Sequence, residues 1–355
     1  MNNEAAQSHV TPGTQQPASP VSGGRRRMLG LGGAAAAMSL GGCATIKSWL
    51  PAYLGGTPAR PAATPAAAGS RIWLDMDQKQ LDAAYDQAAY APNRDTVLKR
   101  YEAESERVRA RIGAPRRFSY GSEPIEALDW YATDRPNAPV HIFLHGGAWR
   151  GGTSKEYGFP AELVTRAGAH YVVPDFVSVI DAGGNLQPMA DQVRRAIAWV
   201  YRHARRHGAD PERITLSAHS SGAHLAAVAL TSDWWQDFNL PKNLVKNALL
   251  CSGLYDLRPV RLSSRSNYVK FTDAMEEALS PQRHLDRLAT PLIIAYASGD
   301  TPEFQRQSRD FAAAVKAAGK PVQLLVGQHY NHFELLETMG SPYGVLGEVV
   351  GRMVK

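Results

Sequence analysis

One short stretch near the middle of the chain constrains the fold more than any other. Residues 214–217 (Ile-Thr-Leu-Ser) have the composition of a short buried strand, and residues 222–230 that of an apolar helix. Between them, residues 218–222 are Ala-His-Ser-Ser-Gly, a small-x-Ser-x-Gly pattern at a strand-to-helix junction. This context is typical of a nucleophile elbow, where a serine lies on a tight turn before a helix. On its own the pattern fits a plain turn at the end of a core strand equally well.

Two other stretches favour the elbow. Upstream, the apolar segment 140–145 leads into Gly146 and Gly147. Their backbone N–H groups can form the second half of an oxyanion hole, the first half being the N-terminal amides of the helix after the elbow. Downstream, the strand-like segment 291–297 is followed by Asp300.

The next strand-like segment, 322–326, precedes a loop that contains His332. Ser220, Asp300 and His332 therefore follow one another in the chain order of α/β-hydrolase triads, each just past a strand. We interpret Ser220 as the nucleophile, Asp300 as the acid and His332 as the base.

Each downstream member has rivals. Thr301 and Pro302 have the residue types of a helix start, which leaves Asp300 in the preceding loop and puts Glu303 on the helix. Glu303 and Asp256 remain alternative acids, although this placement favours Asp300. His329 is an alternative base, because spacing alone does not distinguish it from His332.

The strand-like segments predict an α/β fold. About eight strands are expected, the later ones separated by helices, as in a mostly parallel sheet flanked by helices. The first two lack an intervening helix and are expected to form an antiparallel edge. The expected strands cover residues 118–120, 127–131, 140–145, 171–176, 213–217, 247–252, 291–297 and 322–326, with a long helix over 189–207.

Two segments outside this pattern could modify the active-site entrance. Apolar residues recur at helical spacing over residues 75–112, so a pair of helices is expected there before the first strand. They would form either a lid over the site or a layer packed on the side of the domain. Residues 254–286 are irregular, and the Arg/Ser-rich stretch 261–266 is expected to be a loop or cap insertion.

The N-terminal part of the chain resembles an export signal. Residues 25–29 are Arg-Arg-Arg-Met-Leu, a twin-arginine pattern, and a Gly/Ala-rich stretch ends in Leu-Gly-Gly before Cys43, like a bacterial lipobox. We predict a signal over residues 1–42, lipidation of Cys43 and a Pro/Ala-rich linker over 43–70, followed by one hydrolase domain over 71–355. The protein would then be exported and held at the periplasmic face of a bacterial membrane. The alternative is an ordinary cleaved signal with an incidental cysteine.

Charge and motifs exclude several other classes of protein. The formal net charge is +6, but the basic residues are scattered or interleaved with acids, so no nucleic-acid partner is expected. The sequence contains no His-Glu-x-x-His motif, no pair of Cys-x-x-Cys motifs and no P-loop. We therefore expect neither a metal nor an organic cofactor.

With these motifs in view, the sequence resembles kynurenine formamidase (arylformamidase) and its related esterases, within the α/β-hydrolase superfamily. The resemblance spans about residues 75–340, nearly the whole mature domain. It is carried by the segments 145–149 (His-Gly-Gly-Ala-Trp), 217–226, 299–308 and 331–334, together with 81–90 and 120–124. Ala218 departs from the family pattern, because it replaces the first glycine of the elbow.

The resemblance implies the same triad of Ser220, Asp300 and His332, with Gly146, Gly147 and Ser221 forming the oxyanion hole. His145 and Trp149 are expected to contact substrate, although Trp149 could equally be a core aromatic residue.

Formylkynurenine breakdown is intracellular, whereas this chain carries an export-like signal. The expected activity is therefore hydrolysis of short-chain or aromatic carboxylic esters. The alternatives are an arylformamidase acting on N-formyl arylamines and a binding lipoprotein without catalysis. The expected partners are a small ester or formamide and, through Cys43, a membrane surface.

Overall fold

The computed structural model describes residues 70–355. The predicted signal over 1–42, the lipidation of Cys43 and the predicted linker, apart from residue 70, lie outside the described residues. Within residues 70–355, no helix combines the length and apolar character needed to cross a membrane.

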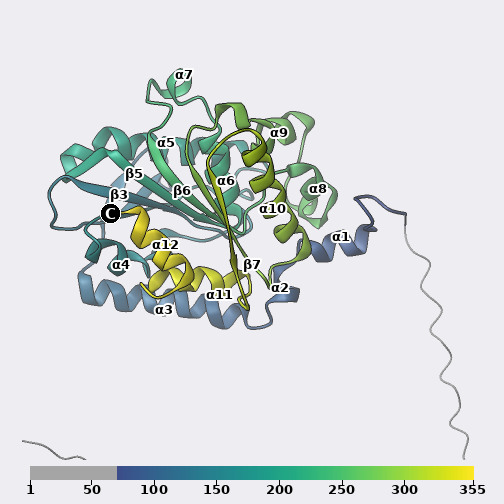
Figure 1. Cartoon of the computed structure of the whole chain (residues 1–355), viewed down its shortest axis with the longest axis horizontal. Helices are drawn as coiled ribbons and strands as arrows, with labels where there is room; N and C mark the ends of the chain where they lie inside the picture. The colour runs from purple at the N-terminus through teal and green to yellow at the C-terminus, as the bar shows by residue number, and fades with distance from the viewer. Residues whose placement is uncertain (1–69) are drawn as a thin grey trace, which may run out of the picture. The chain divides into compact units, whose positions relative to one another are not determined.

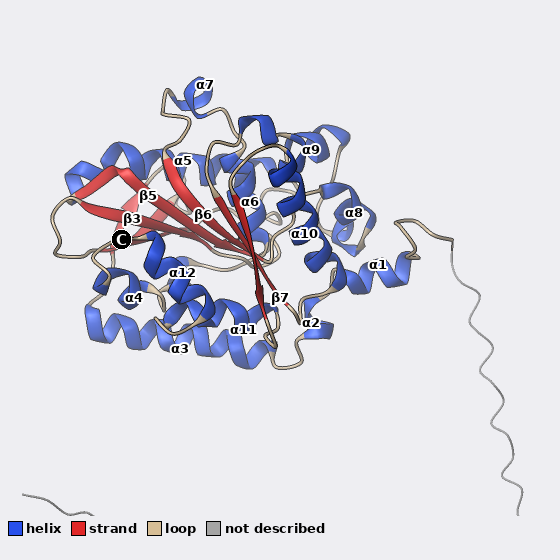
Figure 2. Cartoon of the chain, viewed as in Figure 1, coloured by secondary structure: helices blue, strands red, loops and turns tan. Residues whose placement is uncertain are grey.

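A single sheet of eight strands organises the described residues (Figure 2). Its strand order is β1-β2-β4-β3-β5-β6-β7-β8, and β2 alone runs in the direction opposite to the other seven strands. The predicted mostly parallel sheet with an antiparallel edge is therefore confirmed. The strands are β1 (Arg116–Ser119), β2 (Ala127–Tyr131), β3 (Ala138–Leu144), β4 (His170–Pro174), β5 (Ala209–His219), β6 (Val245–Cys251), β7 (Leu292–Ala297) and β8 (Val322–Gly327).

Helices cover both faces of this sheet (Figure 1). One face packs against α5 (Gln187–His203), α6 (Ser221–Leu230) and α10 (Pro302–Ala317). The other packs against α3 (Arg94–Ile112), α4 (Ala161–Arg166), α11 (His332–Glu337) and α12 (Val345–Met353). The remaining α-helices of the described residues are α1 (Gln78–Ala84), α2 (Gln87–Tyr90), α7 (Trp234–Phe238), α8 (Leu257–Leu262) and α9 (Asp273–Ala278).

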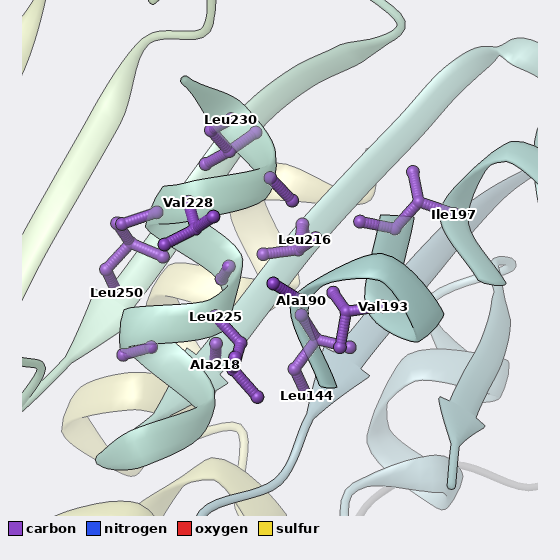
Figure 3. Close-up of a cluster of buried hydrophobic side chains, with 14 of the residues drawn as sticks. Leu144, Ala190, Val193, Ile197, Leu216, Ala218, Leu225, Val228, Leu230 and Leu250 are labelled. Atoms are coloured by element: carbon purple, nitrogen blue, oxygen red, sulfur yellow. The ribbon is translucent and has the colours of Figure 1, made fainter. Parts of the chain in front are cut away.

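The two layers follow from the alternation of side chains along buried strands. In β3, Ile142 and Leu144 join the core under α5 and α6, whereas Phe143 joins the core on the opposite face. Figure 3 shows Val193 and Ile197 of α5 close to Leu216 of β5, with Leu225 of α6 beside them, all drawn from the first of these cores. The elbow strand and its helix are thus held by buried apolar contacts on both sides of the turn.

The early helices do not share one role. Helix α3 packs into the core on the face opposite α5 and α6 through Val97, Tyr101 and Val108, which are almost fully buried. This matches the alternative of a layer packed on the domain. Helices α1 and α2 lie instead beside the start of α10, where Thr301 Oγ1 donates a hydrogen bond to the Ala84 carbonyl.

Of the two expectations for residues 261–266, a loop or a cap insertion, the loop was wrong. Helix α8 extends to Leu262, and a 3-10 turn follows over Ser264–Asn267. The serines of this stretch, which suggested a loop, act as turn and cap residues: the Ser263 hydroxyl donates to the Val260 carbonyl and accepts from the Arg265 amide. Arg265 itself is buried, at 8% relative exposure.

Candidate active site

The predicted elbow forms a strained turn between β5 and α6. Ser220 lies between them with φ +57° and ψ −126°, a backbone conformation that non-glycine residues rarely adopt. The turn also requires a small residue at position 222, because a Cβ there would lie 2.3 Å from the His145 carbonyl oxygen. Ala218 is fully buried in the core shown in Figure 3, so the methyl group that replaces the usual glycine hydrogen is accommodated.

The structure brings the three predicted catalytic residues together. His332 Nδ1 lies 2.6 Å from Asp300 Oδ1, and its Nε2 lies 2.9 Å from Ser220 Oγ. The carboxylate can only accept, so Nδ1–H donates to Asp300 and Nε2 is left to accept the serine proton. Ser220, His332 and Asp300, the predicted nucleophile, base and acid, are therefore connected in one buried chain of hydrogen bonds, the arrangement that an activated serine requires.

Helix starts hold the base and the acid in place. His332 is the first residue of α11, whose N-cap is Asn331; the Asn331 side chain accepts from the Glu334 amide and the Glu334 side chain bonds back to the Asn331 amide. This reciprocal capping box explains the Asn-His-Phe-Glu segment. Thr301 is the N-cap position of α10 and Pro302 its first residue, as predicted, so Asp300 lies in the loop just before the helix.

The structure separates the triad candidates from their rivals. The Glu303 carboxylate accepts from the Tyr85 hydroxyl and pairs with Arg306. The Asp256 carboxylate accepts from the Arg258 amide at the start of α8. The exposed His329 lines an outer hollow. None of these three side chains is hydrogen-bonded to Ser220 or His332 within the described residues.

Asp300 has partners that sequence reasoning missed. Its Oδ2 accepts from Ser252 Oγ at 2.7 Å and from the Ala297 amide at 2.9 Å. Its Oδ1 accepts from Gln87 Nε2 at 3.1 Å, alongside His332. Gln87 is the first residue of α2, more than 200 positions before Asp300, so no local pattern signals this contact. The early helices thus supply a direct partner of the acid.

The turn after β3 lies against the nucleophile. A Cβ at Gly146 would lie 3.0 Å from Ser220 Cβ. Gly147 has φ +121°, and a Cβ at this position would lie 2.1 Å from the Gly151 carbonyl oxygen. Glycine is therefore required at position 147. Among the hydrogen bonds of residues 70–355, the amides of Gly147 and Ser221 have no acceptor. Free amides beside a nucleophile are what an oxyanion hole requires, and this role remains a prediction.

His145 and Trp149, the predicted substrate contacts, are both buried, each with a relative exposure of only 1%. The His145 ring is stacked between Phe176 and Tyr157, with ring centroids 4.4 and 5.4 Å away. The Trp149 indole N–H donates to His224 Nδ1 at 3.2 Å, and its backbone amide donates to Ser221 Oγ at 3.1 Å. Both residues support the oxyanion turn from inside, and their contact with substrate stays a prediction.

Buried neutral histidines under the site predict acid sensitivity. Burial lowers the pKa of His224 to about 4 and that of His141 to about 3. In the unfolded chain both bind protons near pH 6.5, so the stabilisation is complete above that pH and is lost as the pH falls toward the folded-state pKa values.

We expect the free energy of unfolding to be lower at pH 5.0 than at pH 7.5, by roughly 2 kcal/mol for each of these histidines. Urea denaturation at the two pH values measures this difference. An unchanged free energy of unfolding would contradict the assignment of two buried neutral rings.

Comparisons with known proteins agree with this geometry. A family model described as BD-FAE matches residues 128–249. Kynurenine formamidase from Danio rerio is 30% identical over 298 residues, covering 79% of this chain and 98% of that protein. Kynurenine formamidase from Salmo salar is 31% identical, covering 75% of this chain and 93% of the relative. In structure, the esterase LipW from Mycobacterium marinum aligns with a TM-score of 0.60 at 19% identity, covering 78% of this chain and 95% of LipW.

The strand order, the elbow after β5 and the LipW alignment place the chain among the α/β-hydrolases. Its relatives are hydrolases, and so is this protein. At 30% identity over nearly the full length of the Danio rerio protein, the chain belongs to the kynurenine formamidase family. The fold and family expected from the sequence are therefore confirmed.

Proposed function

We propose that this protein is a serine hydrolase that cleaves short-chain or aromatic carboxylic esters through an acyl-enzyme intermediate on Ser220. The observation that carries the proposal is the hydrogen-bonded chain from Ser220 through His332 to Asp300. The free amides of Gly147 and Ser221 beside it support the same reaction, since acyl transfer develops negative charge on the carbonyl oxygen.

The geometry defines the order of proton transfers. As Ser220 Oγ attacks the carbonyl carbon, its proton moves to His332 Nε2, and Asp300 stabilises the imidazolium that forms. The tetrahedral oxyanion accepts from the amides of Gly147 and Ser221. His332 then returns the proton to the leaving alcohol, and water activated by the same histidine hydrolyses the acyl-enzyme. Each step uses only groups of this chain, the substrate and water.

The second candidate is an arylformamidase that acts on N-formyl arylamines such as N-formylkynurenine. The near-complete coverage of the Danio rerio kynurenine formamidase favours it. The chemistry is the same acyl transfer, with a formyl group on Ser220 and an aromatic amine as the leaving group. A third candidate, a lipoprotein that binds without catalysis, predicts a triad serine that does not react with acyl substrates.

Measuring kcat/KM side by side for p-nitrophenyl acetate, p-nitrophenyl butyrate and N-formylkynurenine tests the first two candidates. The ratio compares transition-state binding directly. The proposed esterase requires the short-chain esters to be the better substrates. A preference of several orders of magnitude for N-formylkynurenine would overturn it in favour of the formamidase, and the absence of turnover with all three would favour the binding protein.

We also propose that the enzyme works outside the cytoplasm, attached to the periplasmic face of a bacterial membrane by a lipid on Cys43. The twin-arginine pattern and the lipobox-like Leu-Gly-Gly-Cys segment support this location. Replacing Cys43 by serine is expected to move the exported protein from the membrane fraction to the soluble periplasmic fraction. If wild type and C43S fractionate alike, the lipid anchor is wrong.

A further inference from the structure

A buried arginine lies next to the proposed active site without an acid to pair with. Arg265 is 8% exposed, and its side chain is surrounded by aromatic rings. The guanidinium carbon lies 5.4 Å from the ring centre of Trp149, 5.7 Å from that of Phe304 and 6.0 Å from that of Tyr85. Cation–π attraction to three rings partly replaces the hydration that burial removes.

The hydrogen bonds of Arg265 leave its charge uncompensated. Nη1 donates to the Tyr268 hydroxyl at 2.9 Å and Nη2 donates to the Tyr85 carbonyl at 3.1 Å, whereas Nε has no acceptor within the described residues. No carboxylate of residues 70–355 forms an ion pair with it. Glu303 shares Tyr85 with this cluster, but Arg306 already neutralises it. Burying an unpaired charge is costly, which indicates that an anion completes the arrangement.

A second unpaired arginine belongs to the same cluster. Arg150, which directly follows Trp149, lies over the Tyr268 ring at 4.6 Å, and it too forms no ion pair with the described residues. Tyr268 is therefore held between two cations. Arg150 is exposed to solvent, so the cluster places a second, hydrated cation beside the buried one.

The cluster is adjacent to the reacting groups. Trp149 bonds through its backbone amide to Ser221, next to the nucleophile. Phe304 packs edge-on against His332, with ring centroids 5.2 Å apart. Arg265 contacts both aromatic rings, so a single side chain separates it from the base on one side and from the oxyanion turn on the other.

We propose that Arg265, assisted by Arg150, binds a carboxylate of the substrate, so that this enzyme prefers aryl esters or aryl formamides bearing an anionic group. The inference rests on the proposed function for the reaction itself and adds the substrate class. A guanidinium with unused N–H groups can hold a carboxylate by two parallel hydrogen bonds. The carboxylate of a formylated aromatic amino acid is one group of this kind.

Two ester substrates that differ only in charge test the proposal. For the full chain, kcat/KM is measured with 3-(4-acetoxyphenyl)propanoate and with the neutral 3-(4-acetoxyphenyl)propanamide. We expect the wild type to prefer the carboxylate by about 10- to 100-fold, the range of one charge-assisted contact. Arg265→Gln is expected to abolish this preference by raising KM for the anionic ester, leaving the neutral ester within about threefold. Arg265→Lys should retain part of it.

Arg287→Gln serves as the matched control, because Arg287 is an exposed arginine of the separate 3-10 turn Leu285–Arg287. It should leave the rates with both substrates unchanged. An equal loss of kcat/KM for both esters in Arg265→Gln would show that Arg265 has only a structural role and would overturn the proposal. Unchanged kcat/KM for both esters would overturn it as well.

Calorimetric binding of 3-phenylpropanoate and 3-phenylpropanamide separates this inference from the proposed reaction. The proposal requires tighter binding of the carboxylate, lost in Arg265→Gln, even if neither ester is hydrolysed. Equal affinity of the wild type for the two compounds would contradict it whatever the activity.

Discussion

Replacing Ser220 by alanine is expected to lower kcat by about 10⁴- to 10⁶-fold while leaving the fold intact. The side chain supplies the atom that attacks the substrate, and no other hydroxyl bonds to His332 within the described residues. Alanine keeps the backbone strain at φ +57° and removes only the oxygen. Initial rates with p-nitrophenyl acetate measure the loss, and thermal denaturation shows that the variant is folded.

Ser221→Ala is the control for this experiment. The elbow contains two adjacent serines, but the Ser221 hydroxyl accepts from the Trp149 amide, whereas its backbone amide is the group assigned to the oxyanion. Alanine retains that amide, so the loss of kcat should remain within about tenfold. A severe loss in Ser221→Ala with normal activity in Ser220→Ala would reverse the assignment of the nucleophile.

The replacement of Asp300 by asparagine is expected to lower kcat by about 10³- to 10⁴-fold through the tautomer of His332. The Ala297 amide is a fixed donor to Oδ2, so the oxygen of an asparagine would occupy that position. Its NH₂ group would then face His332 Nδ1 and the Gln87 amide. A donor at that position stabilises the tautomer with hydrogen on Nε2, which cannot accept the proton of Ser220.

Rates for Asp300→Asn are to be compared with those for Asp256→Asn. Asp256 is the rival acid, and the structure places it at the start of α8, paired with Arg283. We expect the second variant to stay within a few-fold of wild type. If Asp256→Asn loses as much activity as Asp300→Asn, the geometric assignment of the acid is wrong.

Local patterns were sufficient to predict the framework of this protein. All eight predicted strands are present. The central strands were recognisable as short apolar runs because a parallel sheet buried on both faces needs continuous apolar segments, whereas the edge strand β1 is mostly exposed. The elbow was recognisable at Ser220 because the turn tolerates so few residues, as the close approach at Gly222 shows. The chain order of strands then brought Asp300 and His332 to the same edge as Ser220.

The contacts that refine the site depend on distant parts of the chain. Gln87 reaches Asp300 across more than 200 residues, and Arg265 enters the aromatic cluster from a stretch whose composition is typical of a loop. Composition indicates exposure for arginine and serine, whereas tertiary packing has buried both Arg265 and Ser263. Long-range packing of this kind leaves no periodic signal in the sequence.

The anionic subsite and the family membership bear on the choice between the two substrate classes. The relatives include kynurenine formamidases and esterases, and a carboxylate-binding arginine suits an amino-acid formamide as well as an anionic ester. The charge-matched esters and N-formylkynurenine therefore measure different properties: the first reports recognition of the carboxylate, and the second reports the leaving group that the enzyme accepts.

Labelling with a fluorophosphonate tests the central claim most directly, since this reagent phosphonylates only an activated serine. The native protein should incorporate one label, mapped by peptide mass spectrometry to Ser220, and both the Ser220→Ala variant and heat-denatured wild type should incorporate none. Absence of label in the native protein, or a label on Ser221 or any other residue, would contradict the assignment of Ser220 as the nucleophile.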